Sequence, residues 1–129
     1  MTAELTVLAL AGLLQGLQFA AFSVAANRQI GPRVAMGTRD VKPELTGTAG
    51  RLQRALNNHF EGLVLFTLAV VVVTVPGQSS GLTATSAWIY LLARILYVPA
   101  YVFGWVPWRS VIWAVGFAAS MIMILASLF

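Results

Sequence analysis

The chain has 129 residues, of which 59% are hydrophobic and 9% charged, with a net charge of +4 and a mean hydropathy of +0.83. A soluble domain carries about 25% charged residues, so these few charges are too sparse to cover a surface in water. The absence of cysteine excludes disulfides, thiolate metal sites and a cysteine nucleophile. We therefore expect an all-α integral membrane protein whose apolar surface faces lipid.

Four long apolar runs predict four transmembrane helices, at about residues 5–26, 49–75, 82–103 and 110–129. The first run is longer than the apolar part of a signal peptide and follows Glu4 rather than basic residues, so we expect it to remain in the mature protein. The connections are short, and no linker or repeat separates the runs. We expect residues 1–129 to form a single transmembrane domain, a four-helix bundle.

The distribution of basic residues predicts how the bundle is oriented. The turn between the second and third spans and the C-terminus carry no Lys or Arg, whereas Arg109 flanks the turn between the third and fourth spans. The positive-inside rule then places the connections between spans 1 and 2 and between spans 3 and 4 in the cytoplasm, and both termini outside. In a bacterium the protein would lie in the inner membrane. The first connection and its flank hold Arg28, Arg33, Arg39 and Lys42.

A polar stripe interrupts the second span. Residues 62–75 supply only 14 apolar residues, about 21 Å of helix, whereas the hydrocarbon core is about 30 Å thick. Glu61 and Asn58 must therefore lie inside the membrane. At 100° per residue, Arg51, Arg54, Asn58 and Glu61 fall within about an 80° arc. Ionisable groups inside a membrane are costly and mark functional sites.

The third span carries a second polar stripe. Arg94, Tyr97 and Tyr101 share one face within about 60°. Arg109, at the start of the fourth span, lies on the same cytoplasmic side of the membrane. The two stripes are therefore expected to open toward the same leaflet.

The charges of these stripes do not balance. One interpretation is internal pairing, in which Glu61 neutralises Arg54 or Arg94. The other is an anionic ligand, because Arg51, Arg54, Arg94 and Arg109 outnumber the one glutamate, and guanidinium groups match carboxylates and phosphates well. The residues favour the ligand but leave both interpretations open.

Two further features of the apolar helices have ordinary structural interpretations. His59 lies off the polar stripe and has no second histidine with which to share a metal, so a structural or interfacial role is favoured over catalysis. Gly12 and Gly16 match the small-xxx-small pattern of close helix packing, which is frequent by chance in apolar segments.

In combination, the motifs resemble those of the MAPEG family, the membrane-associated proteins in eicosanoid and glutathione metabolism. The likeness covers nearly the whole chain. Its motifs are Arg54-Ala55-x-x-Asn58-x-x-Glu61, Arg94-x-x-Tyr97-x-x-x-Tyr101, Arg109-Ser110-Val111-x-Trp113, and the basic connection with Arg33-Val34-Ala35-Met36-Gly37 and Pro43-Glu44-Leu45.

The resemblance implies four-helix protomers that form homotrimers, with glutathione held between neighbouring subunits near the cytoplasmic leaflet. Arg109 would take the position of the arginine that stabilises the glutathione thiolate, which is the nucleophilic form of the thiol. The residues implied to hold glutathione are Arg28, Arg51, Arg54, Asn58, Glu61, Arg94, Tyr97 and Tyr101.

The implied function is a glutathione-dependent transferase or peroxidase that acts on lipophilic electrophiles. Relatives often carry Tyr and Pro where this chain has Gly62 and Val64. These departures keep open a non-catalytic glutathione- or lipid-binding protein of the same fold. Small multidrug transporters are chains of similar size, but they depend on a glutamate in the first span, which here is uncharged from Leu5 to Ala26.

Overall fold

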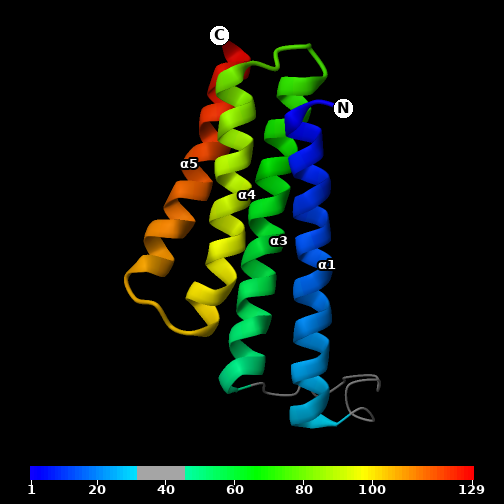
Figure 1. The fold of residues 1–129 in the computed structure, drawn as a ribbon, viewed down its shortest axis with the longest axis vertical. Coiled ribbons are helices and arrows are strands. Elements are labelled where there is room, and N and C mark those ends of the chain that lie inside the picture. Colours follow the sequence, from blue (N-terminus) through cyan, green and yellow to red (C-terminus); the bar gives the residue numbers. More distant parts are fainter. Residues whose placement is uncertain (32–45) are drawn as a thin grey trace.

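The computed structural model describes residues 1–31 and 46–129, and the protein is a bundle of four long helices (Figure 1). All four are long and apolar enough to cross a membrane. The predicted all-α, four-helix membrane fold is confirmed, and the described residues contain no strand. The helices are α1 (Ala3–Ile30), α3 (Gly47–Thr74), α4 (Gly81–Val102) and α5 (Trp108–Leu128).

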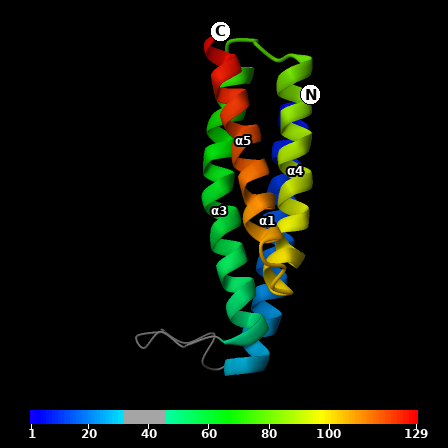
Figure 2. The same cartoon turned by 90° about the vertical axis from the view of Figure 1, so that its left-hand side faces the viewer.

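Successive helices run in opposite directions. Helices α3 and α4 pack together at the centre, and α1 and α5 pack on opposite sides of this pair (Figures 1 and 2). Both termini and the turn between α3 and α4 lie at one end of the bundle, called here the upper end as in Figure 1. The turn between α4 and α5, the last turn of α1 and the first turn of α3 lie toward the lower end.

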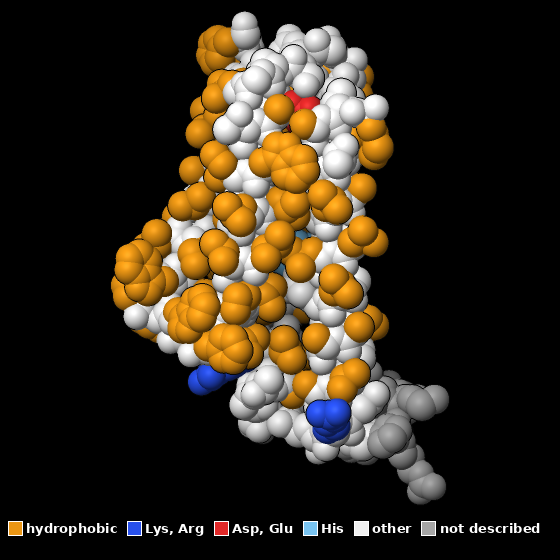
Figure 3. Space-filling model, in the orientation of Figure 1, with side chains coloured by type: hydrophobic (Ala, Val, Ile, Leu, Met, Phe, Trp, Pro, Cys, Tyr) orange, Lys and Arg blue, Asp and Glu red, His pale blue; other side chains and the backbone are white. Residues whose placement is uncertain are grey.

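The sides of the bundle are apolar, and the basic side chains on its visible face lie at one end. Figure 3 shows hydrophobic side chains over the height of the visible face, with Lys and Arg confined to the lower end. Large apolar side chains such as Leu13, Leu92 and Leu125 are more than half exposed. Such a surface is suited to lipid. The predicted basic residues Arg33, Arg39 and Lys42 lie outside the described residues, as do the Arg33–Gly37 and Pro43–Leu45 motifs.

Small residues allow close packing in α5 rather than in α1. A Cβ on Gly116 would lie 3.6 Å from the Ala93 Cβ, so α5 approaches α4 closely at this position. Gly12 and Gly16 are exposed, and a Cβ on either would meet nothing within 4 Å. Within one protomer, the small-xxx-small pattern of α1 therefore mediates no helix contact among the described residues.

A buried carboxylate joins α1 to the turn between α3 and α4 at the upper end. Glu4 is 0% exposed and accepts hydrogen bonds from Ser79 Oγ, at 2.8 and 2.9 Å, and from Thr83 Oγ1, at 2.6 Å. Glu4 lies in the first turn of α1, and Thr83 belongs to the capping box that begins α4. The carboxylate therefore lies near the positive ends of two helix dipoles, which favours its charge. From sequence, Glu4 served only as evidence against a signal peptide.

Candidate functional site

Three helices contribute side chains spaced three and four residues apart, which places each set on one helix face. The predicted residues Arg54, Asn58 and Glu61 lie on α3, and their face is turned toward α4 and α5. The α4 set extends the predicted stripe by one turn, and the α5 set begins at Arg109. These sets comprise Tyr90, Arg94, Tyr97 and Tyr101 on α4, and Arg109, Trp113, Gly116 and Ser120 on α5.

Arg94 is the most deeply buried arginine among the described residues, at 3% exposed, and neutral groups hold it. Its Nη1 donates to Asn58 Oδ1 at 3.0 Å, its Nε donates to His59 Nδ1 at 3.3 Å, and its Cζ lies 4.4 Å from the centroid of the Tyr97 ring. These contacts fix the guanidinium between α3 and α4.

His59 joins three helices and is oriented by its two ring nitrogens. Its Nε2 lies 3.1 Å from the carbonyl oxygen of Ala11 on α1. Because a carbonyl only accepts, Nε2 carries the hydrogen and Nδ1 accepts from Arg94, which makes the imidazole neutral. These contacts fit the structural role that the sequence favoured for His59, because they position Arg94.

Two arginines share one tyrosine ring lower in the bundle. Arg54 Nε donates to the Tyr101 hydroxyl at 3.1 Å, and its Cζ lies 5.9 Å from the centroid of the ring. Arg109 Cζ lies 4.8 Å from the same centroid. The Tyr97 ring lies 5.7 Å from the Tyr101 ring, measured between centroids. Cations are attracted to aromatic faces, but the contact neutralises no charge.

The two arginines predicted as carboxylate anchors lie apart from these contacts. Arg51 Nη1 donates to the carbonyl oxygen of Val102 at 2.9 Å, so it caps the last residue of α4. Arg28 lines a separate cleft of about 420 Å³ between the end of α1 and the start of α3. Within one protomer, the structure therefore brings Arg28 to none of the other predicted site residues.

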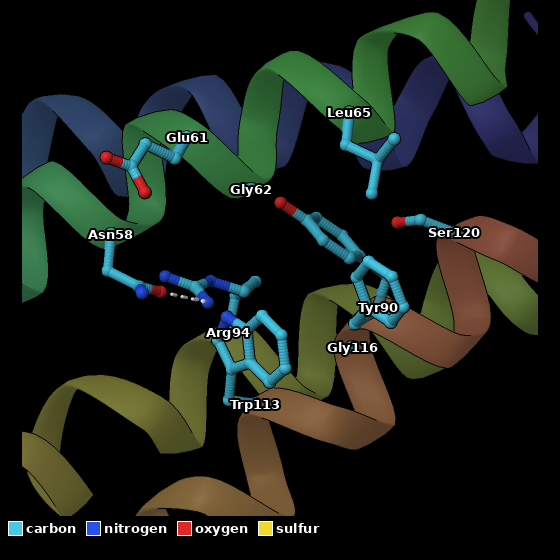
Figure 4. A pocket seen from close by; sticks show the side chains of 10 residues that line it. Asn58, Glu61, Gly62, Leu65, Tyr90, Arg94, Trp113, Gly116 and Ser120 are labelled. Atoms are coloured by element: carbon cyan, nitrogen blue, oxygen red, sulfur yellow. Dashed lines mark hydrogen bonds between the residues drawn. The ribbon is translucent and has the colours of Figure 1, made fainter.

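Two neighbouring pockets lie along the faces of α3, α4 and α5. The outer pocket, of about 200 Å³, is lined by Asn58, Tyr97, Arg109, Ser110 and Trp113. The inner pocket, of about 210 Å³, lies farther from the lower end (Figure 4). Asn58 and Trp113 line both. The inner pocket is lined by Asn58, Glu61, Gly62, Leu65, Tyr90, Arg94, Trp113, Gly116, Phe117 and Ser120.

The hydrogen bonds of the arginines bear on the two interpretations of the charge surplus. Arg54 donates to a tyrosine, and Arg94 donates to an amide and an imidazole, whereas the internal-pairing interpretation had Glu61 neutralise one or the other of them. Glu61 itself is exposed at the edge of the inner pocket. Arg94 and Arg109 therefore line cavities while their own contacts are neutral, and Arg54 is exposed outside both pockets. Guanidinium groups in such a position can bind an anionic ligand.

Sequence reasoning missed five residues of the inner pocket: Leu65, Tyr90, Gly116, Phe117 and Ser120. A signal for Tyr90 existed, because it lies four residues before Arg94 on the same face of α4. Ser120 and Gly116 continue the spacing of Arg109, but small residues are ordinary in apolar helices. Among the described residues, no group of three or more His, Asp or Glu side chains is placed to hold a metal ion.

The motifs that carried the resemblance are matched by a comparison over the full bundle. The sequence model of the MAPEG family matches residues 5–129, which include all the site residues described above. Comparisons with curated proteins and with solved structures gave no match. The family match covers essentially the whole chain. The chain therefore belongs to the MAPEG family, the membrane-associated proteins in eicosanoid and glutathione metabolism.

Proposed function

We propose that this protein is a glutathione-dependent transferase or peroxidase that acts on lipophilic electrophiles. One observation carries the proposal: the guanidinium groups of Arg54, Arg94 and Arg109 contact neutral acceptors and aromatic faces, and Arg94 and Arg109 line two neighbouring cavities. Glutathione has two carboxylates and a thiol, so it supplies the negative charge that these groups lack. Guanidinium groups bind carboxylates through paired hydrogen bonds, which suits this ligand.

The outer pocket suits the thiol end of glutathione. Arg109 lines it together with the polar side chains of Asn58, Tyr97 and Ser110. A cation beside the sulfur favours the thiolate, which is the nucleophile that attacks an electrophile. Arg109 is thus the residue proposed to stabilise the thiolate. Arg54, Asn58, Glu61, Arg94, Tyr97 and Tyr101 are proposed to bind or organise the peptide.

The position of Arg28 agrees with the proposed homotrimer. Arg28 is exposed and lies in a cleft apart from the two pockets. If glutathione lies between subunits, Arg28 reaches it from a neighbouring protomer, and Arg51 anchors a carboxylate with the nitrogens that do not cap α4. We propose in addition that residues 1–129 form one domain with the lower end in the cytoplasm, both termini outside, and the inner membrane as its location in a bacterium.

A non-catalytic glutathione- or lipid-binding protein of the same fold is the second candidate. Gly62, where relatives often carry tyrosine, favours it, because a hydroxyl that contacts glutathione is missing from α3. Turnover separates the two candidates, since both predict binding.

Calorimetry with glutathione and S-hexylglutathione tests binding, and conjugation of 1-chloro-2,4-dinitrobenzene or reduction of cumene hydroperoxide tests turnover. We expect saturable binding that falls at least tenfold in Arg54→Ala and in Arg109→Ala. Arg109→Lys keeps the charge but not the planar fork, so it is expected to retain more turnover than Arg109→Ala. Ser127→Ala, a change on α5 outside both pockets, is the control.

Each outcome is informative. Absence of saturable glutathione binding to the unmodified protein would refute the first candidate and leave only the lipid-binding form of the second. Binding without product in either assay would support the non-catalytic candidate. Equal turnover in Arg109→Ala and the unmodified protein would remove the role assigned to Arg109 while leaving the binding site in place.

A further inference from the structure

Three buried polar groups of the inner pocket have no hydrogen-bond partner among the described residues: the Tyr90 hydroxyl, Arg94 Nη2 and Ser120 Oγ. Their residues are 2%, 3% and 1% exposed. Figure 4 shows the Tyr90 hydroxyl pointing toward Gly62, and the Ser120 hydroxyl on the other side of the Tyr90 ring, near Leu65. Polar groups kept from water are costly unless they are hydrogen-bonded, so the pocket is incomplete without an occupant.

The Tyr90 hydroxyl is held in place by its ring, and the Ser120 hydroxyl does not bond back to its own helix. The Tyr90 ring stacks on Phe66 with centroids 4.0 Å apart and planes 1° from parallel. Hydroxyls elsewhere in the bundle bond back to their own helix, as Thr67 does to the Leu63 carbonyl and Ser127 to that of Ile124. The Ser120 hydroxyl makes no such bond and is directed into the cavity.

The remaining walls of the inner pocket are apolar. Leu65, Trp113 and Phe117 line it, and its volume of about 210 Å³ exceeds the roughly 150 Å³ of a cavity known to bind benzene. Gly62 keeps part of this space open. A Cβ there would lie 3.5 Å from the Tyr90 hydroxyl and 3.8 Å from Arg94 Nη1. The pocket therefore accommodates an apolar ring or short chain beside a polar corner.

We propose that the inner pocket binds a lipid-dissolved molecule with an apolar body and one oxygen-bearing group, such as a hydroxyl, hydroperoxide or epoxide. Arg94 Nη2 can only donate, and the hydroxyls of Tyr90 and Ser120 can donate as well, so each of them complements an acceptor oxygen, with Tyr90 and Arg94 both beside Gly62. The inner pocket adjoins the outer pocket, because Asn58 and Trp113 line both. Its assignment as the site of the second substrate rests on the proposed function. The binding itself is independent of glutathione.

Two probes of nearly the same shape test the polar corner. Cumyl alcohol (2-phenyl-2-propanol) carries the oxygen, and cumene (isopropylbenzene) lacks it. Binding of each radiolabelled probe is measured by equilibrium dialysis against nanodiscs that contain the protein, with empty nanodiscs to subtract partition into lipid. We expect saturable binding, tighter for the alcohol. Tyr90→Phe and Ser120→Ala should each weaken alcohol binding about tenfold, the effect of one hydrogen bond at the upper end of its range, and change cumene binding less than twofold.

The control is Ser127→Ala, which removes a hydroxyl from the same helix outside the pocket and should change neither affinity. Ser120→Ala tests the proposal by itself if Tyr90→Phe does not fold. The proposal is overturned if the alcohol binds no more tightly than cumene. It is also overturned if nanodiscs with the protein take up no more alcohol than empty nanodiscs. In either case the hydroxyls would be satisfied by water. Arg54→Ala should weaken glutathione binding at least tenfold and leave alcohol binding unchanged, so the two proposals fail separately.

Discussion

His59 gives a direct test of how the buried arginine is positioned. Replacement of His59 by Phe keeps a ring of similar size but removes the acceptor for Arg94 Nε and the donor to the Ala11 carbonyl. Two polar replacements separate these contacts. Asn places an acceptor oxygen near the position of Nδ1, and Gln places a donor near the position of Nε2.

The expected cost of His59→Phe follows from burial. A hydrogen bond to a charged group contributes about 1.5–3 kcal/mol, whereas hydrogen bonds between membrane helices average about 0.6 and reach about 1.7 kcal/mol. His59 is 0% and Arg94 3% exposed, so water cannot replace the lost partner. Arg94 keeps Asn58, which limits the loss. We expect a decrease of about 2 kcal/mol in the free energy of unfolding, a change of about thirtyfold in the unfolding equilibrium.

The assay combines unfolding in mixed detergent micelles, followed by circular dichroism, with calorimetry of S-hexylglutathione binding. His59→Asn should retain more affinity than His59→Gln, because only Asn can still accept from Arg94. Some loss of stability is expected in His59→Asn, since a smaller side chain leaves a cavity. The positioning role would be refuted if His59→Gln bound S-hexylglutathione more tightly than His59→Asn. It would also be refuted if His59→Phe equalled the unmodified protein in both stability and affinity.

The same unfolding titration tests three other features. Phe66→Ala should cost about 3–5 kcal/mol, because Phe66 is fully buried against Tyr90, whereas Phe60→Ala at an exposed position should cost little; equal costs would contradict this packing. Glu4→Ala should cost about 3 kcal/mol, through the loss of charge-assisted hydrogen bonds at the upper end, without changing S-hexylglutathione affinity; an altered affinity would link the two ends. Gly116→Leu should cost about 1–3 kcal/mol, and Gly12→Leu, which meets no neighbour, should be neutral; a stable Gly116→Leu would show that α5 moves away freely.

Hydropathy and helical periodicity were sufficient for the fold and for the polar stripes. Long uncharged runs admit few structures in lipid, because every backbone group must be satisfied within the chain. The three- and four-residue spacing of Arg54, Asn58 and Glu61 fixed their common face before any neighbour was known. The identity of the neighbour was not available from the sequence. The sequence therefore left open whether Glu61 neutralises Arg54 or Arg94, whereas the hydrogen bonds of these two arginines go to Tyr101, Asn58 and His59.

Sequence reasoning missed the residues whose role depends on missing hydrogen-bond partners or on neighbours from other helices. Tyr90 and Ser120 are unremarkable in an apolar helix, and their importance lies in hydroxyls without a partner. His59 lies off the stripe, so only a structural or interfacial role was predicted for it. It lies on the adjoining face of α3, which packs against α1, and the Ala11 carbonyl of α1 orients its ring. Both features depend on the order of the helices around α3, which spacing along one helix cannot encode.

The two ends of the bundle show how a structural charge differs from a functional one in lipid. Both oxygens of the Glu4 carboxylate accept hydrogen bonds, and Glu4 lies near two helix N-termini, so its charge is satisfied within the protomer. Arg94 is almost as deeply buried, but one of its nitrogens is left without a partner and its contacts are neutral. A membrane protein that needed only packing would gain by completing or removing such a group. The unfinished hydrogen bonding of Arg94, next to a cavity, is therefore the reason why we propose a ligand site in the lower half of the bundle.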